Sequence, residues 1–300
     1  MPSRISTSQL FSNAQNHITT AREREVSSAT KAATQKEITK PSQSPAQWTV
    51  AANLKDDLSI RETIAKNASF ANSFLTASDN TLAQLQELVG RTHELAIEAS
   101  GSASVSPEQY HRVLPEVEGL FQNVLQALNT EFGHRPIFGG YQSQQKAFDA
   151  EGRFMGDNGK IEVEIDRNLK VPVNLSGAQI ILGEGLQRGV NLIDTYQSLL
   201  TGLREGDVES VRASLDGLTG VVDQFSLGRT QIAGAMTEIQ KALDSHQIHQ
   251  EQSQKVISEL EDADPIKVFS DLTRDQTVLR AAIETNRKVL NEDPVGTLLK

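Results

Sequence analysis

The stretch of sequence that decides the fold runs from residue 208 to residue 243 and reads VESVRASLDGLTGVVDQFSLGRTQIAGAMTEIQKAL. Its apolar residues recur at alternating spacings of three and four, the heptad pattern of a helix that packs lengthwise on another helix. A helix of this length spans about 54 Å, so a second long helix is expected beside it. The seam consists of Val208, Val211, Leu215, Leu218, Val222, Phe225, Arg229, Ile232, Met236, Ile239 and Leu243, and Arg229 is its one charged member.

A matching pattern lies upstream, between residues 64 and 99. The same spacing is kept by Ile64, Ala68, Ala71, Leu75, Ser78, Leu82, Leu85, Val89, Thr92, Ala96 and Ala99. Several of these side chains are small, which lets two helices approach closely. A third helix is predicted over residues 107–130, because Ser106 and Pro107 form a typical helix start and an apolar stripe follows. These helices are predicted to form an antiparallel bundle.

The middle of the chain differs from both sides. Nine of the 20 glycines fall in residues 131–185. There the segment KIEVEID at 160–166 alternates polar and apolar residues, as a strand with one buried face does, and a second strand is predicted at 171–175. Pro172 cannot donate a ladder hydrogen bond, so this second strand is expected to be an edge strand or to carry a bulge.

The two ends of the chain are amphipathic but weakly so. Residues 1–40 carry six basic and three acidic side chains, and residues 256–300 carry six basic and nine acidic ones, so the ends could attract each other. A helix with so marginal a seam needs a partner, either the opposite end or a neighbouring molecule, and we expect both ends to be mobile in the free chain. The predicted assembly seam consists of Phe11, Ile18, Val268, Leu272, Leu279 and Ile283.

These patterns predict a mainly α protein, an elongated antiparallel helical rod bundle built from N- and C-terminal segments. Residues 46–130 and 186–255 are expected to form the rods of the bundle. Residues 131–185 are expected to form a small β-rich insert. Residues 1–45 and 256–300 are expected to form terminal helices.

The composition argues against several functional classes. The 300 residues include 29 basic and 39 acidic side chains, a formal net charge of -10, so we expect no nucleic-acid partner. Because cysteine is absent, a disulfide scaffold, a thiol nucleophile and a thiolate metal site are excluded. No apolar stretch is long enough for membrane insertion, and the N-terminus lacks the apolar run of a cleaved signal peptide.

No pattern in the sequence points to catalysis. No nucleophile motif of the GxSxG kind occurs, and the glycine pairs are too short for a phosphate-binding loop. His246 and His249 are three residues apart and could share a helix face for a metal ion, but a polar helix surface in a Gln-rich run explains them without a third ligand. We therefore predict no enzyme activity, no catalytic residue, no cofactor and no metal site.

Several short segments, taken in order, resemble the bacterial flagellin-like family. At the start these are RIST at 4–7, KPSQSPA at 40–46 and NSFLTASDNTL at 72–82. In the middle, PIFGGY at 136–141, AF at 147–148 and GRFMGDNG at 152–159 look like the hook-associated protein 3 branch, the hook–filament junction proteins. LEDAD at 260–264 and LL at 298–299 are similar to the family's last helix. Where the family usually has paired Asp after Pro-Ser, this chain has Gln43-Ser44.

The resemblance implies a structural role in the bacterial flagellum. Such a protein is exported without cleavage through the flagellar type III apparatus, with an export chaperone as partner, and is extracellular. It assembles with itself as a ring between the first hook-associated protein and the first layer of flagellin, through coiled-coil packing of its terminal helices. The family's fold further implies that the terminal helices, 1–45 and 256–300, form an inner core and that 131–185 is an outer insert.

Other interpretations of the same residues remain open. A filament flagellin shares the terminal design and polymerises into the filament itself. A receptor or signalling coiled coil would explain the long helices, but it is expected to carry a membrane span or heptads that continue to the end of the chain. An enzyme on a helical scaffold would reveal itself by a bound metal or nucleotide.

Overall fold

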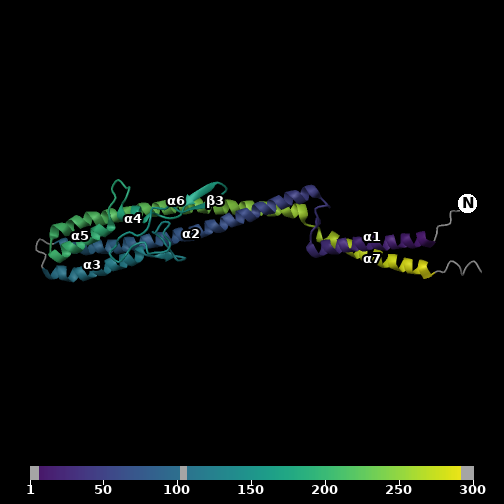
Figure 1. Ribbon diagram of the computed structural model, residues 1–300, viewed down its shortest axis with the longest axis horizontal. Coiled ribbons are helices and arrows are strands. Elements are labelled where there is room, and N and C mark those ends of the chain that lie inside the picture. Colours follow the sequence, from purple (N-terminus) through teal and green to yellow (C-terminus); the bar gives the residue numbers. More distant parts are fainter. Residues whose placement is uncertain (1–6, 102–106, 292–300) are drawn as a thin grey trace, which may run out of the picture. The chain divides into compact units, whose positions relative to one another are not determined.

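The computed structural model describes residues 7–101 and 107–291. Helices dominate, and the strands are short (Figure 1). The predicted mainly α fold with a small β-rich insert is confirmed, whereas Ser106, the predicted helix cap, lies outside the described residues. In chain order the elements are α1 (Thr7–Thr34), α2 (Pro45–Ser100), α3 (Pro107–Leu128), β1 (Glu131–Phe132), β2 (Arg135–Pro136), β3 (Glu162–Asp166), β4 (Leu169–Pro172), α4 (Gly177–Leu182), α5 (Leu192–Glu205), α6 (Val208–Glu261) and α7 (Pro265–Asn291).

The chain divides into two compact units. Residues 1–60 and 248–300 form one, here called the terminal unit, and residues 61–247 form the other, the bundle unit. The long helices α2 and α6 each continue from one unit into the other. The division therefore falls inside these two helices and not in a loop.

The core of the bundle unit follows the two heptad seams. All eleven seam positions between Ile64 and Ala99 on α2 are buried, with exposed fractions of at most 8%. On α6 every second seam position is buried, and the intervening positions are half-buried. The buried α6 positions are Val211, Leu218, Phe225, Ile232 and Ile239. Removal of this apolar surface from water is the main force that holds the bundle unit together.

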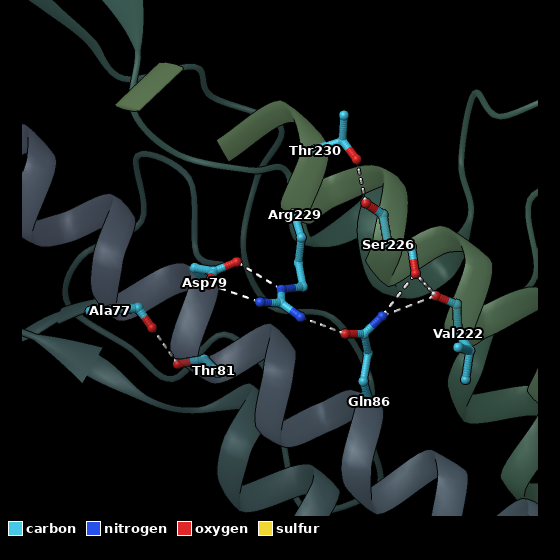
Figure 2. Close-up of polar contacts among 8 residues, drawn as sticks. All are labelled: Ala77, Asp79, Thr81, Gln86, Val222, Ser226, Arg229 and Thr230. Atoms are coloured by element: carbon cyan, nitrogen blue, oxygen red, sulfur yellow. Dashed lines mark hydrogen bonds and ion pairs between the residues drawn. The ribbon is translucent and has the colours of Figure 1, made fainter. Parts of the chain in front are cut away.

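Arg229, the charged member of the α6 seam, is paired across to α2. Its guanidinium donates two parallel hydrogen bonds to Asp79, from Nε to Oδ1 at 2.7 Å and from Nη2 to Oδ2 at 3.1 Å, and a third from Nη1 to Gln86 Oε1 at 3.1 Å (Figure 2). Gln86 Nε2 in turn donates to Ser226 Oγ at 2.9 Å. Because a two-point contact tolerates little sliding, this network fixes the register of α6 against α2.

Helix α5 is an element that the sequence patterns did not separate from the rods. Its start is capped by Asn191, whose side chain accepts hydrogen bonds from the backbone N–H groups of Ile193 and Asp194. Its end is closed by Gly206 in the left-handed conformation, with φ of +69°. A short helix that begins with Asn and ends with Gly reverses the chain before α6, and α5 packs on α3.

The β-rich segment contains two antiparallel hairpins, β1–β2 and β3–β4. The predicted hairpin after residue 160 is confirmed, but its second strand spans residues 169–172 and not 171–175. The reversal occurs at Arg167 and Asn168, and Asn168 adopts φ of +63°, a conformation that Asn tolerates well. A turn this tight leaves the following residues free to pair at once.

The irregular pairing predicted for this hairpin lies in its first strand. The register shifts between Glu164 and Asp166, whereas Pro172 pairs with Glu162 at the end of β4, where its missing N–H interrupts no ladder. Within the irregular stretch the carbonyl of Ile165 accepts a hydrogen bond from Nε2 of His246 on α6, at 2.8 Å. The buried imidazole of His246 therefore anchors the hairpin to α6 and is not exposed for a metal ion.

Replacing Asp79 by Asn is expected to lower the free energy of unfolding by about 1 kcal/mol, a modest figure because both side chains are partly exposed and screened by solvent. The destabilisation should shrink at high salt, since partly exposed ion pairs weaken as ionic strength rises. Urea unfolding followed by circular dichroism measures both effects.

The matched control is Glu62→Gln, which breaks an exposed pair between Glu62 and Lys66 on the same helix. This control should leave the unfolding midpoint unchanged. If Asp79→Asn lowered the free energy of unfolding equally at low and high salt, this would contradict an electrostatic origin of the contact between Arg229 and Asp79.

Candidate functional site on the terminal helices

The two ends of the chain are partners of each other in the terminal unit. Helices α1 and α7 lie side by side and run antiparallel (Figure 1). Near the C-terminal end of α1, Ser28 Oγ donates to Asp275 Oδ2 at 2.5 Å. Near its N-terminal end, the backbone carbonyl of Ala14 accepts from Asn286 Nδ2 at 2.9 Å. Of the two kinds of partner that the sequence left open, the structure contains the opposite end of the same chain.

The interface between α1 and α7 has a thin apolar core. Its buried members are Ala14, Ala21 and Val268, and two of these three side chains are single methyl groups. In the whole terminal unit, only five described apolar residues are buried. Each buried methyl group contributes little, about 0.8 kcal/mol, so the pairing of these helices is weakly supported by burial.

The six residues of the predicted assembly seam do not share one environment. Val268 is buried, and Ile18, Leu272 and Leu279 are half-buried. Ile283 is 48% exposed. The side chain of Phe11 lies outside the described residues. The half-buried members could still gain burial from a further partner, and Ile283 has most to gain.

Exposed apolar side chains are concentrated in the terminal unit. Of the fifteen large apolar residues that are exposed among the described residues, nine belong to this unit, although it holds little more than a third of the chain. Scattered single apolar residues are normal on a protein surface, but this enrichment indicates an interaction surface. The nine are Val26, Val50, Ile60, Ile248, Val256, Ile266, Phe269, Val278 and Ile283.

Charge is distributed as unevenly as apolar surface. The terminal unit has 14 basic and 15 acidic residues, a net charge of -1, and the bundle unit has the remaining 15 basic and 24 acidic residues, a net charge of -9. A nearly neutral surface does not repel copies of itself, whereas a strongly negative one does. The terminal unit is thus the part of the chain best suited to close self-association.

A buried carboxylate at the end of α6 holds the N-terminal and C-terminal segments of the terminal unit together. Glu261, at the end of α6, is 2% exposed. It accepts hydrogen bonds from Nζ of Lys36 at 2.5 Å and from Nζ of Lys55 at 2.5 and 2.7 Å. We call this cluster of Glu261, Lys36 and Lys55 the joint. Two backbone hydrogen bonds support it: the N–H of Glu37 donates to the carbonyl of Glu261, and the N–H of Ala263 donates to the carbonyl of Gln35.

The ion pair between Glu261 and Lys36 shifts the pKa values of both groups. Burial by itself raises the pKa of Glu261, but the hydrogen bonds from Lys36 and Lys55 outweigh it, so the pKa lies below its ordinary value. The hydrogen bond to Glu261 raises the pKa of Lys36. Glu261 is therefore charged at neutral pH, and this charge stabilises the contact with the two lysines.

Two local motifs complete the joint. Asp264 accepts a hydrogen bond from the backbone N–H of Ile266 at 2.8 Å, so α7 begins at Pro265 behind an acidic cap. In the loop before α2, Gln43 Oε1 accepts from the backbone N–H groups of Thr39 and Lys40, at 2.7 and 3.1 Å. Gln43 thereby makes polar contacts at the point where the sequence departs from the family pattern.

Clusters of metal-ligating side chains and membrane-spanning helices were both sought among the described residues. Within residues 7–101 and 107–291, no three His, Cys, Asp or Glu side chains are grouped as ligands would be. In the same ranges, no helix combines the length and the apolar character that crossing a bilayer requires. The properties that set the terminal helices apart are exposed apolar surface and near-neutral charge.

Comparison with protein families agrees with this picture. The model of the bacterial flagellin N-terminal helical region matches residues 5–143. The predicted resemblance to the flagellin-like family is confirmed. No curated protein matches the chain.

Solved structures of flagellar proteins share the fold. A Vibrio parahaemolyticus protein assigned as flagellar hook-associated has a TM-score of 0.68 at 14% identity, over 73% of this chain and 100% of its own. FlgL of Bacillus cereus has a TM-score of 0.56 at 17% identity, over 68% and 96%. The flagellar junction protein FlgL of Legionella pneumophila has a TM-score of 0.58 at 12% identity, over 71% and 99%.

Replacing Glu261 by Gln is expected to destabilise the joint at neutral pH by about 2 kcal/mol, because two lysines lose a charged acceptor. In the parent chain the pKa of Glu261 is lowered, so its contribution is present above the ordinary value near 4.5 and is lost as pH falls through the folded value. Hydrogen exchange of the Glu37 and Ala263 amides, measured from pH 7 to pH 3, follows the joint directly.

In the variant these amides should exchange faster at pH 7, and the gap from the parent chain should close towards pH 3. Replacing Glu259, an exposed acid on the same helix, by Gln serves as the control and should change neither amide. A gap that persists unchanged at pH 3 would contradict the role of the carboxylate charge.

Proposed function

We propose that this chain is a structural subunit of the bacterial flagellum that forms the junction between hook and filament. In this role its terminal helices pack with those of neighbouring copies to make a ring. The first hook-associated protein contacts one side of the ring, and flagellin contacts the other. The protein needs no catalytic residue or cofactor for this task.

The observation that carries the proposal is the contrast between the two units. The bundle unit has a deep apolar core and most of the negative charge, whereas the terminal unit has a thin core, nine exposed apolar residues and almost no net charge. A helix pair with this design gains much of its stability from neighbours. The match to a flagellin helical region and the shared fold of flagellar junction proteins support the same role.

Export fits the same physical properties. A weakly packed terminal pair unfolds at low cost, as passage through a narrow type III channel requires, and regains its burial on assembly. An export chaperone that covers the exposed apolar residues before assembly would keep the free chain from aggregating. Mobility of α1 and α7 in the free chain stays a prediction, and residues 1–6 and 292–300 of these segments lie outside the described residues.

A filament flagellin is the alternative that one observation favours. The matched family model describes a helical region of flagellin, and a polymerising subunit needs the same terminal design. The two roles differ in copy number and in neighbours. They are therefore distinguished by what happens to the filament when the chain is missing.

Deletion of the gene is expected to leave hooks without filaments while flagellin accumulates in the medium, because filament subunits have no junction on which to assemble. Electron microscopy of the cells and immunoblotting of the medium measure this. A strain complemented with the intact gene is the control. Normal filaments would contradict a structural role in the flagellum, and loss of flagellin from the medium would favour the filament role.

Replacing Leu272 and Leu279 by Ala is expected to weaken the α1–α7 pair by about 1–2 kcal/mol per residue, less than for fully buried leucines. Hydrogen exchange should accelerate in α1 and α7 while the amides of the bundle unit stay protected, and cells should lose assembled filaments. Thr277→Ala, an exposed change on the same helix, is the control. Loss of protection in the bundle unit would contradict the separation of the two units.

A further inference from the structure

The terminal unit has a groove on the side of α1 that faces away from α7. Its volume is about 560 Å³, and α1 supplies one wall and the loop before α2 the other. Val26, 54% exposed, is its one large apolar side chain. Among its lining residues are Thr19, Arg22, Glu23, Val26, Lys40 and Gln43.

The loop wall of this groove is held in place by several contacts. Gln43 accepts the hydrogen bonds from Thr39 and Lys40 described above, and Ile38 is buried beneath the loop. The backbone N–H of Glu37 donates a hydrogen bond to the backbone carbonyl of Glu261 at 2.7 Å. The groove is therefore formed before any partner arrives, which reduces the entropy lost on binding.

An apolar ridge lies on the opposite side of the helix pair. Ile266 is 84% exposed, the most exposed large apolar residue among those described, and Phe269, one helical turn further along α7, is 56% exposed. Val268, the buried α7 residue that packs towards α1, lies two positions from Ile266 and therefore on nearly the opposite face. Ile266 thus faces away from α1 and from the groove, and Phe269 lies on the flank of α7, about 100° around the helix from Val268.

The charges beside the groove and the ridge are complementary. The groove has Arg22, Lys40 and one acid, Glu23, a net charge of +1. Beside the ridge, Asp262, Asp264 and Lys267 are all exposed at the start of α7, and together they have a net charge of -1. A contact that brings the two together places two carboxylates near two cations and covers the apolar side chains of both surfaces.

We propose that the groove of one copy receives the Ile266–Phe269 ridge of the next copy. The groove and the ridge face apart on one molecule, so no copy can fill its own groove. Two different patches also make the contact heterologous, and repetition of a heterologous contact produces a ring or a helical array and not a closed pair. The proposal deepens the proposed function, on which it rests, by naming the surfaces through which copies of the chain meet.

The absence of cysteine from the sequence makes a direct test possible. The full chain would be prepared with Val26→Cys and Ile266→Cys together, concentrated, and treated with a short bis-maleimide cross-linker. Both positions are exposed, so the fold should tolerate them, and circular dichroism checks this. The matched control pairs Val26→Cys with Val278→Cys, which is exposed on a different face of the same helix.

The expected result is a ladder of dimers, trimers and larger products, with a yield at least fivefold above the control pair. Mixed chains that carry one cysteine each should give a dimer only when Val26→Cys meets Ile266→Cys. Charge reversal by Arg22→Glu with Lys40→Glu should reduce the yield of cross-linked products at least threefold. Equal yields from the test and control pairs, no ladder, or dimers between identical single variants would overturn the proposal.

The gene deletion separates this inference from the proposed function. Bare hooks in the deletion strain together with no ladder would mean that the junction role holds and this contact is wrong. A ladder together with normal filaments would mean that the contact exists and the junction role is wrong. Cross-linking of the double variant, Val26→Cys with Ile266→Cys, in isolated flagella to a different protein, with no product between copies, would also overturn the contact.

Discussion

The packing of α2 against α6 is the constraint on which the rest of the molecule depends. Each helix is more than fifty residues long, and neither could persist in water without an apolar seam to bury. Apolar burial sets how strongly the two helices attract, but it specifies their register poorly, since sliding by one heptad leaves a similar seam. The two-point contact between Arg229 and Asp79 removes that ambiguity (Figure 2). The other elements of the bundle unit, α3 to α5 and the two hairpins, cover a seam whose alignment is already set.

The terminal unit uses the same kind of helix pair with the opposite balance of forces. In the bundle unit, the buried seam positions of α6 are all large apolar side chains, whereas between α1 and α7 alanine occupies two of the three buried positions. The polar contacts at Ser28, Asp275 and Asn286 give this pair direction without adding much burial. The buried Glu261 then fixes the chain where the pair begins. A pair that is well oriented and weakly packed is suited to a partner that completes it.

Sequence patterns alone gave the helices of the bundle and the seam residues that lie in its core, because a heptad repeat states directly which face is buried. They also named the opposite end of the chain as one of two possible partners for each terminal helix, because the two ends carry opposite charge. They missed α5, whose signals are a single Asn cap and a single Gly stop within a longer apolar region. They could not assign a role to Arg229, since its partner is 150 residues away, or to Glu261, whose burial depends on three segments that meet only in the folded chain.

The β3–β4 hairpin has a consequence for how this protein can change over evolutionary time. Its reversal at Arg167 and Asn168 is exposed, and the hydrogen bond from His246 to the Ile165 carbonyl holds the strand behind it. Lengthening a surface turn costs little entropy when the strands that flank it are fixed. This turn is therefore a place where segments of new length and sequence can be gained without disturbance of the helical seam, so the hairpin can diversify while the helices stay the same.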